Sequence, residues 1–158
     1  MTGSALEETI DHTSIVRLHQ AYADIVTRRA WPELAELFTP DATIDLDLVT
    51  RDPISIVGPK ALGTFVGQAI ERFEHFQFVV LNIHVELWPD GDRDAATARV
   101  FMAELRQVTA DAGRDDAHGL YRDRYVRVDG RWWIAARRYR SMARFPGGQV
   151  FPLPADLT

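Results

Sequence analysis

Residues 120–144, LYRDRYVRVDGRWWIAARRYRSMAR, decide the fold, because they predict two long strands joined by a tight turn. The strands cover 120–128 and 132–144, and Asp129-Gly130 stands between them. Both turn residues tolerate a positive φ, which two-residue hairpin turns require. We therefore expect an antiparallel hairpin at this point of the chain.

The same two-residue period extends upstream of the hairpin. Segments 76–88 and 95–109 predict two further long strands, with a turn at 89–92 between them and a polar loop at 111–116 after them. A shorter strand is expected at 42–49, where apolar residues alternate with Asp45 and Asp47. Long neighbouring strands with short connections favour antiparallel pairing.

Helical periodicity is confined to the first half of the chain. A first helix to about residue 29 is indicated by apolar residues at helical spacing, namely Ile15, Leu18, Tyr22, Ile25 and Val26. A second, short helix opens at Trp31-Pro32, since proline suits a first helical turn, and a third follows Gly58-Pro59.

Three helices followed by a run of long strands predict the α+β class with a single domain over residues 12–144. Residues 1–11 are polar and predict a flexible leader, with Asp11 or Thr13 capping the first helix. Residues 145–158 predict a Pro/Gly-rich tail whose apolar side chains pack in part against the domain.

The composition excludes several classes of function. The chain has 158 residues, a net charge of −5 and no cysteine, which argues against a nucleic-acid partner, a thiol nucleophile or a thiolate metal site. We expect no metal and no organic cofactor. No apolar run is long enough to span a membrane, and no signal peptide pattern opens the chain, so a cytoplasmic protein is expected.

A series of short motifs over residues 12–144 resembles the SnoaL-like branch of the nuclear transport factor 2-like superfamily. The group includes polyketide cyclases and is similar to scytalone dehydratase, bile-acid dehydratase, hexachlorocyclohexane dehydrochlorinase and ketosteroid isomerase. The motifs are Tyr22, Trp31, Leu34, Leu37-Phe38, Pro40-Asp41-Ala42, Gly58-Pro59, Asn82 and the segment 121–132. The resemblance implies three helices on a strongly curved antiparallel sheet, a cone with an internal pocket for a small hydrophobic molecule.

Two pocket residues carry over from the resemblance. Tyr22 matches a pocket tyrosine on the first helix, and Glu104 matches a pocket aspartate of the bile-acid dehydratase. Period two places Ala98, Glu104 and Arg106 on one strand face, where a buried Glu104 would gain a raised pKa suited to acid–base catalysis. Equally, Glu104 and Arg106 could form an exposed surface pair, and Tyr22 could belong only to the helix stripe.

The departures from the family pattern are as informative. Thr27 and Phe78 stand where the dehydratases carry a catalytic Asp and His, so their usual proton-abstracting dyad is missing. His75, His84 and His118 are expected to be surface or loop residues. Other predicted substrate contacts are Thr27, Phe65, Phe78, Asn82, Tyr121 and Arg140, with Arg106 or Arg140 holding an anionic group.

Several functions fit this reading. The first is a cofactor-independent lyase or isomerase acting on a small hydrophobic cyclic or polyketide-like metabolite. The second is a binding protein that kept the pocket and lost the dyad. A third is epoxide hydrolysis by Glu104, Arg106 and Asp123, which resemble the residues of limonene epoxide hydrolase. A fourth is a role as an accessory subunit, similar to the small subunits of ring-hydroxylating dioxygenases. The strand expected at 76–88 has large apolar residues on both faces: Phe76, Phe78 and Val80 on one, and Val79, Leu81, Ile83 and Val85 on the other. The outer face of the sheet is therefore expected to be apolar, which predicts a homodimer through that face.

Overall fold

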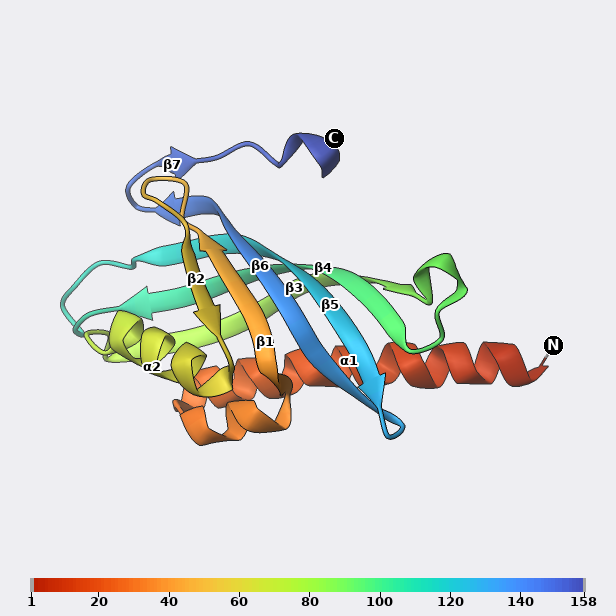
Figure 1. Ribbon diagram of the computed structural model, residues 1–158. Helices are drawn as coiled ribbons and strands as arrows, with labels where there is room; N and C mark the ends of the chain where they lie inside the picture. The colour runs from red at the N-terminus through yellow and green to blue at the C-terminus, as the bar shows by residue number, and fades with distance from the viewer. Residues whose placement is uncertain (1, 158) are drawn as a thin grey trace.

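The computed structural model describes residues 2–157, which form a long helix, four shorter helical segments and a curved mixed sheet (Figure 1). The helical elements are α1 (Thr2–Arg28), α2 (Pro59–Ile70) and the 3₁₀ segments η1 (Trp31–Glu36), η2 (Pro89–Gly91) and η3 (Ala155–Leu157). The strands are β1 (Phe38–Asp47), β2 (Ile54–Val57), β3 (His75–Leu87), β4 (Ala95–Gln107), β5 (Asp116–Val128), β6 (Arg131–Phe145) and β7 (Gln149–Val150). The α+β class is confirmed.

The sheet has the strand order β2-β1-β6-β5-β4-β3, with β7 added to β6. Strands β3 to β6 form an antiparallel meander, and Asp129-Gly130 makes the predicted turn between β5 and β6, both with positive φ. The expectation of a wholly antiparallel sheet is wrong, because β1 pairs with β6 in parallel. A parallel pair is possible here since the long connection through β2, α2 and the meander brings the chain back beside β1.

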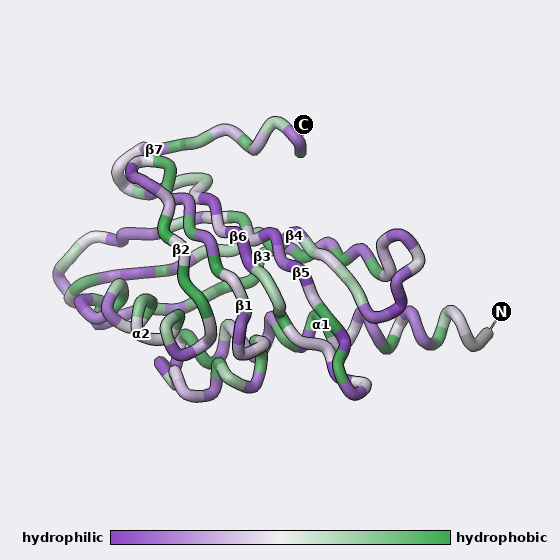
Figure 2. The backbone as a smooth tube through the Cα atoms, viewed as in Figure 1, coloured by the Kyte–Doolittle hydropathy of each residue, from purple (hydrophilic) through white to green (hydrophobic). Residues whose placement is uncertain are grey.

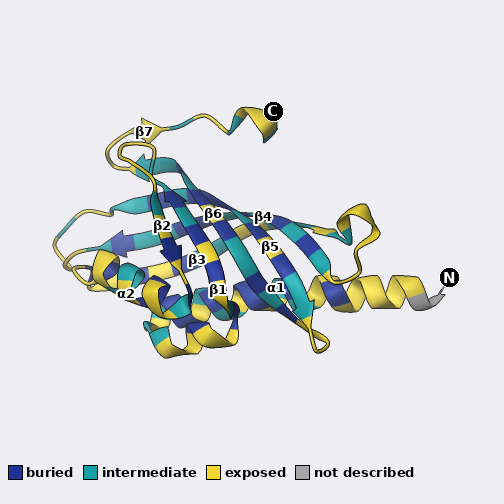
Figure 3. Ribbon diagram, viewed as in Figure 1, coloured by how far each residue is buried: buried dark blue, intermediate teal, exposed yellow. Residues whose placement is uncertain are grey.

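Helix α1 differs from the prediction at its beginning. It starts at Thr2, so the segment expected as a flexible leader is helical from that residue, and neither Asp11 nor Thr13 caps it. The first turns extend past the sheet and are exposed (Figure 3). Met1 and Thr158, the ends of the predicted leader and tail, lie outside the described residues.

Asp11 fastens this helix to the sheet. Its carboxylate is 4% exposed and accepts hydrogen bonds from the indole nitrogens of Trp88 (3.1 Å) and Trp132 (3.0 Å). Arg127 donates to both carboxylate oxygens at 3.0 Å. A buried carboxylate with this many donors is satisfied, and the sequence pattern shows none of these long-range partners.

The second predicted helix is present but is a 3₁₀ segment, with Leu34 as its buried residue. It packs against α2, where two glycines leave space for the side chain of Trp31, the first residue of η1. A Cβ at Gly63 would lie 3.0 Å from the Trp31 Cβ, and one at Gly67 would lie 3.1 Å from the indole nitrogen. The third helix is confirmed as α2.

Strand β3 contains a bulge that reverses its inward face. Val80 pairs with Met102 and Asn82 pairs with Phe101, so Leu81 is the additional residue. Before the bulge Phe76 and Phe78 point into the core, and after it Ile83 and Val85 pack on the core. Asn82 is exposed as a result, so the structure does not place it with the inward-facing residues where substrate binding was expected.

The same bulge removes much of the argument for an apolar outer face. Ile83 and Val85 are not outer residues, and His84 and Glu86 take their place beside Arg99. Hydrophobic and hydrophilic residues alternate along the central strands (Figure 2). The homodimer stays a prediction, now without two of the residues on which it rested.

The C-terminal segment folds back over the outer face of the sheet (Figure 1). Phe151 N–H donates to the Met142 carbonyl at 2.8 Å, and Asp156 accepts two hydrogen bonds from Arg122 at 2.7 and 2.8 Å. Val150 nevertheless remains 71% exposed. Among residues 2–157, no helix combines the length and the hydrophobicity that crossing a lipid bilayer needs.

We expect Asp11→Ala to lower the free energy of unfolding by about 2–4 kcal/mol, because three buried or half-buried donors lose their acceptor. Urea denaturation measures this change. Asp24→Ala is the matched control on the same helix, since Asp24 pairs with Arg28 only at the exposed surface. Equal stability losses for the two variants would contradict the anchoring role of Asp11.

Candidate active site

A pocket of about 380 Å³ lies between the inner face of the sheet and helix α2. Its apolar wall comes from β1 and the loop after it, from α2 and from Phe73. Its polar residues come from α1, from the β1–β2 loop, from the end of α2 and from β4, β5 and β6. They are Tyr22, Arg51, Arg72, Glu104, Arg106, Tyr121, Arg137, Tyr139 and Arg144. Drug-sized ligands occupy cavities of about 300–1,000 Å³.

Glu104 is the one carboxylate among the described residues that line this pocket. Its strand face is the predicted one, since Ala98, Val100 and Met102 are buried on the same side of β4. Burial raises the pKa of Glu104, and the charges of Arg106 and Arg144 oppose that rise only in part. A raised pKa makes a carboxylate a stronger base, which favours the acceptance of a proton.

Arg106 holds Glu104 in place. It donates to the Glu104 carboxylate at 3.1 Å, to the Asp115 carbonyl at 2.6 Å and to the Asp115 carboxylate at 2.8 Å. Its guanidinium carbon lies 4.8 Å from the centre of the Phe73 ring. Because all three guanidinium nitrogens are engaged, Arg106 orients the carboxylate, and it is not the free anion-binding group that the sequence predicted.

Tyr22 and Tyr121 form the aromatic part of the pocket with Phe78 behind them. Tyr22 meets the Phe78 ring edge-on at a centroid distance of 5.2 Å, and Phe78 stacks on Tyr121 at 6.1 Å. Burial raises the pKa of Tyr22 and raises that of Tyr121 well above its ordinary value. Both hydroxyls therefore stay protonated at neutral pH and can donate hydrogen bonds.

Arg137 is a pocket residue that sequence reasoning missed. Its guanidinium carbon lies 4.4 Å from the centre of the Tyr22 ring and 4.0 Å from that of Tyr121. Ala135 is an additional residue of β6, because Ile134 pairs with Tyr125 while Ala136 pairs with Arg124. This bulge turns Arg137 and Tyr139 inward, whereas simple alternation from the buried Trp132 would have turned them outward.

Arg140 is the corresponding wrong prediction. The bulge directs it to the outer face, where it donates to the Asp47 carboxylate at 2.8 Å and does not line the pocket. Of the other predicted substrate contacts, Phe65 and Tyr121 line the pocket. The positive residues that the sequence analysis did not place there are Arg51, Arg72, Arg137 and Arg144.

Asp123 belongs to a buried network behind the pocket. It accepts from Arg137 Nε at 2.9 Å and from Arg137 Nη2 at 2.6 Å, and the Tyr125 hydroxyl lies 3.4 Å away. Tyr125 is also 2.5 Å from His19 Nε2. Asp123 does not line the pocket with Glu104 and Arg106, so the predicted epoxide-hydrolase trio is not assembled. The structural reason is that Asp123 is needed to neutralise a fully buried guanidinium.

His19 was also missed, because its position on α1 reads as part of an ordinary helix stripe. Burial lowers the pKa of His19 to about 4, although the Asp123 carboxylate, 3.5 Å away, acts in the opposite direction. We take the imidazole as neutral, since Arg137 already neutralises Asp123. His19 is thus a hydrogen-bonding member of the network and does not line the pocket.

The two positions of the missing dyad are neighbours in space. The backbone N–H of Phe78 donates to Thr27 Oγ1 at 3.0 Å, which joins α1 to β3. Neither residue is among those that line the pocket, so their predicted roles in substrate binding stay predictions without support from this geometry. Phe78 acts only through its contact with the tyrosine rings, and Thr27 through this backbone hydrogen bond.

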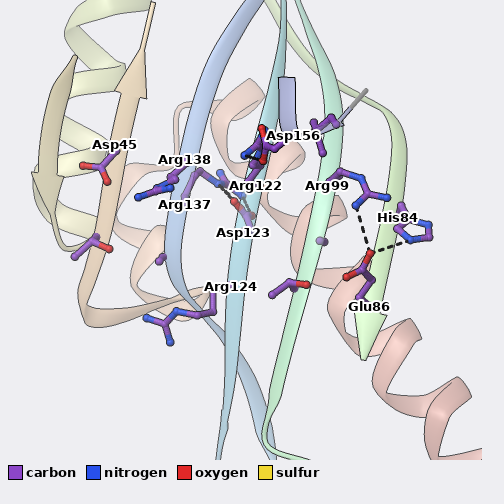
Figure 4. Close-up of a pocket in the computed structure, with 15 residues that line it drawn as sticks. Asp45, His84, Glu86, Arg99, Arg122, Asp123, Arg124, Arg137, Arg138 and Asp156 are labelled. Atoms are coloured by element: carbon purple, nitrogen blue, oxygen red, sulfur yellow. Dashed lines mark hydrogen bonds and ion pairs between the residues drawn. The ribbon is translucent and has the colours of Figure 1, made fainter. Parts of the chain in front are cut away.

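A second hollow of about 490 Å³ lies on the outer face of the sheet (Figure 4). Arg99, Arg122, Arg124, Arg137 and Arg138 line it from three adjacent strands, and the tail residue Asp156 lies beside Arg122. His84 and Glu86 face this side too, which confirms that His84 is a surface residue. The hollow lacks the apolar wall of the inner pocket.

Comparisons with known proteins agree with this architecture. Residues 7–138 match the model of the SnoaL-like domain, and the chain belongs to that family. No curated protein sequence matches the chain.

Solved structures show the same fold at low identity. A putative scytalone dehydratase from Novosphingobium aromaticivorans is 19% identical with a TM-score of 0.74, covering 98% of this chain and 95% of its own. The hexachlorocyclohexane dehydrochlorinase LinA-type3 from Novosphingobium barchaimii is 19% identical with a TM-score of 0.76, covering 95% and 99%. A Mycobacterium tuberculosis protein of unknown function is 24% identical with a TM-score of 0.73, covering 97% and 85%.

We expect the native state to lose up to about 3 kcal/mol of stability as the pH falls from 6.5 towards 4, through His19. In this window the unfolded chain binds a proton on His19 that the folded chain does not accept, so protons favour unfolding. Urea denaturation at several pH values measures the slope, and His19→Gln should make it shallower. An NMR titration midpoint for His19 near 6.5 would contradict the neutral assignment.

Gly119 shapes the pocket by admitting the Tyr139 ring, since a Cβ there would lie 2.1 Å from Tyr139 Cε2. We expect Gly119→Ala to cost about 1–3 kcal/mol of stability by overpacking. In a double-mutant cycle with Tyr139→Ala, the cost of Gly119→Ala should largely vanish, because the clashing ring is gone. Additive effects in the denaturation data would show that the ring is not the cause.

Proposed function

We propose that this protein is a cofactor-independent lyase or isomerase that acts on a small, hydrophobic cyclic or polyketide-like molecule. One observation carries the proposal: Glu104, with its raised pKa, and the Tyr22 hydroxyl line the same apolar-walled pocket. Membership of the SnoaL-like family supports it. So do the names of two structural neighbours, a putative dehydratase and a dehydrochlorinase, which both denote eliminations.

In the proposed reaction Glu104 removes a proton from a carbon next to a carbonyl group. The electron pair moves onto the carbonyl oxygen, and the hydroxyls of Tyr22 and Tyr121 donate hydrogen bonds to the resulting oxyanion. Glu104 then returns its proton, either to another carbon, which is isomerisation, or to a departing hydroxyl, which is dehydration. Arg106 keeps the carboxylate in one orientation throughout this sequence.

Arg137, which lies behind the two tyrosines, also stabilises the negative charge that develops on the carbonyl oxygen in the proposed reaction. Its guanidinium lies under both rings, and its charge opposes the rise in the pKa values of Tyr22 and Tyr121 that burial causes. A nearby fixed cation makes a phenol hydroxyl a better donor to a developing oxyanion. Arg137 is therefore a positioning residue in this mechanism, acting through the two tyrosines.

A second candidate function is the binding of a small molecule without turnover. The observation in its favour is the Thr27–Phe78 pair, which occupies the place of the family's dyad and carries no acid–base group. The cytoplasmic location and the homodimer are further parts of the proposal that rest on the sequence alone.

Proton exchange tests the enzymatic proposal without knowledge of the natural substrate. We expect the protein to speed deuterium incorporation at C1 of 2-tetralone in D₂O, followed by NMR. Glu104→Gln should reduce the rate by about 10²–10⁴-fold, the usual range for a lost general base, and Tyr22→Phe by a smaller factor. Glu74→Gln, at an exposed carboxylate outside the pocket, is the control. Exchange that is unchanged in Glu104→Gln contradicts the mechanism, and binding without exchange favours the second candidate.

A further inference from the structure

We propose that the mouth of the pocket, where Arg144 and Arg51 lie, is a carboxylate-binding subsite. The ligand would then be a hydrophobic ring compound that carries an anionic group at the end away from Tyr22. This inference rests on the proposed function for the identity of the pocket, and it adds the chemical class of the molecule that enters it. It also assigns roles to two arginines that the mechanism does not use.

Most positive charges around the pocket are already neutralised. Arg137 is paired with Asp123 at 2.6 Å, and Arg106 with Glu104 and Asp115. Arg72 lies 3.5 Å from the same Asp115. Among the buried guanidinium nitrogens of these groups, only Nη1 of Arg137 keeps no hydrogen-bond partner. None of the acidic side chains in these pairs lies within ion-pair distance of Arg144 or Arg51.

Arg144 and Arg51 are the cations that lack a partner. Within residues 2–157, neither side chain makes a hydrogen bond or an ion pair, although both line the pocket. Arg144 is half-buried near the end of β6, and Arg51 is exposed on the loop that follows β1. A half-buried guanidinium that makes no hydrogen bond or ion pair favours the uptake of an anion.

Arg144 also lies close enough to the reacting groups to matter. Its charge opposes the rise in the pKa values of both Glu104 and Tyr139. The anion subsite and the acid–base group therefore belong to one pocket. A ligand carboxylate on Arg144 would offset this charge and make Glu104 a stronger base only when the ligand is bound.

The walls between the two ends define the rest of the ligand. Leu46, Leu62, Phe65 and Ile70 offer apolar surface and no hydrogen-bonding groups. A flat ring system suits this section, while the fork of a guanidinium suits a carboxylate. An uncharged hydrophobic ligand would leave both mouth arginines unpaired, so the geometry favours an anionic one.

The outer face supplies a matched control for charge alone. Arg138 likewise makes no ion pair within the described part of the chain, but it is exposed and lies on the opposite side of the sheet (Figure 4). Removing its charge makes the net charge of −5 more negative by the same amount as removing that of Arg144. It should leave the inner pocket untouched.

Isothermal titration calorimetry with 2-naphthoate and its neutral counterpart 2-naphthamide tests the inference. We expect the native protein to bind naphthoate at least about tenfold more tightly, with a preference that shrinks as salt is raised. Arg144→Gln should reduce naphthoate affinity about tenfold and Arg51→Gln about threefold. Neither variant should change naphthamide binding, and Arg138→Gln should change neither ligand.

Equal affinities for the two probes would overturn the inference, as would a preference that survives in the Arg51→Gln/Arg144→Gln double variant. Failure of both probes to bind would overturn it together with the proposed pocket. The proposed catalysis is judged separately, because Glu104→Gln should retain naphthoate binding whether or not the protein exchanges protons.

Discussion

The buried ion pair between Asp123 and Arg137 is the interaction on which the rest of the site depends. Both side chains are almost fully buried, and removing one partner from such a pair typically costs about 3–5 kcal/mol. The pair joins β5 to β6, and His19 and Tyr125 connect it to α1. Tyr22 and Tyr121 rest on the guanidinium, so the pocket's hydrogen-bond donors are fixed by a charge pair that touches no solvent.

Among the described residues, the family's His–Asp dyad is absent from the pocket, although a histidine and an aspartate are neighbours elsewhere in the protein. The chain does contain a histidine beside an aspartate, but His19 and Asp123 lie behind the pocket wall and stabilise Arg137. At the dyad's expected location, Thr27 instead satisfies the Phe78 backbone N–H. In the mechanism that we propose, proton transfer passes to the Glu104 carboxyl group on β4. The fold is shared with the family, while the proposed acid–base residue lies on a different strand.

The sequence predicted those parts of the fold that follow from local periodicity. The sequence predicted three elements correctly: the hairpin at Asp129-Gly130, the helix α2 and the inward face of β4 with Glu104. In each of them the period of apolar residues, two in the strands and 3.6 in the helix, runs without interruption. The errors come from single additional residues. The additional residue Leu81 turns Asn82 to the outer face of the sheet, where simple alternation predicted an inward side chain. The additional residue Ala135 likewise turns Arg137 inward and Arg140 outward. A bulge has no reliable signal in one sequence, since it depends on the register with the neighbouring strand.

The remaining misses depend on contacts between distant residues. Asp11 was predicted as a possible helix cap from its local sequence alone. Its true role was missed because its three hydrogen-bond donors lie far away in the sequence, on β5, on β6 and beside η2. Gly119 lies within β5, and its role depends on the Tyr139 ring of the neighbouring strand, which local periodicity does not show.

The position of the indole rings has a practical consequence for spectroscopy. The chain has four tryptophans, and none is among the residues that line the inner pocket. Two of them, Trp88 and Trp132, donate to Asp11 at the base of α1. Their intrinsic fluorescence therefore reports on the docking of the first helix, whereas occupancy of the pocket is reported by tyrosine absorbance.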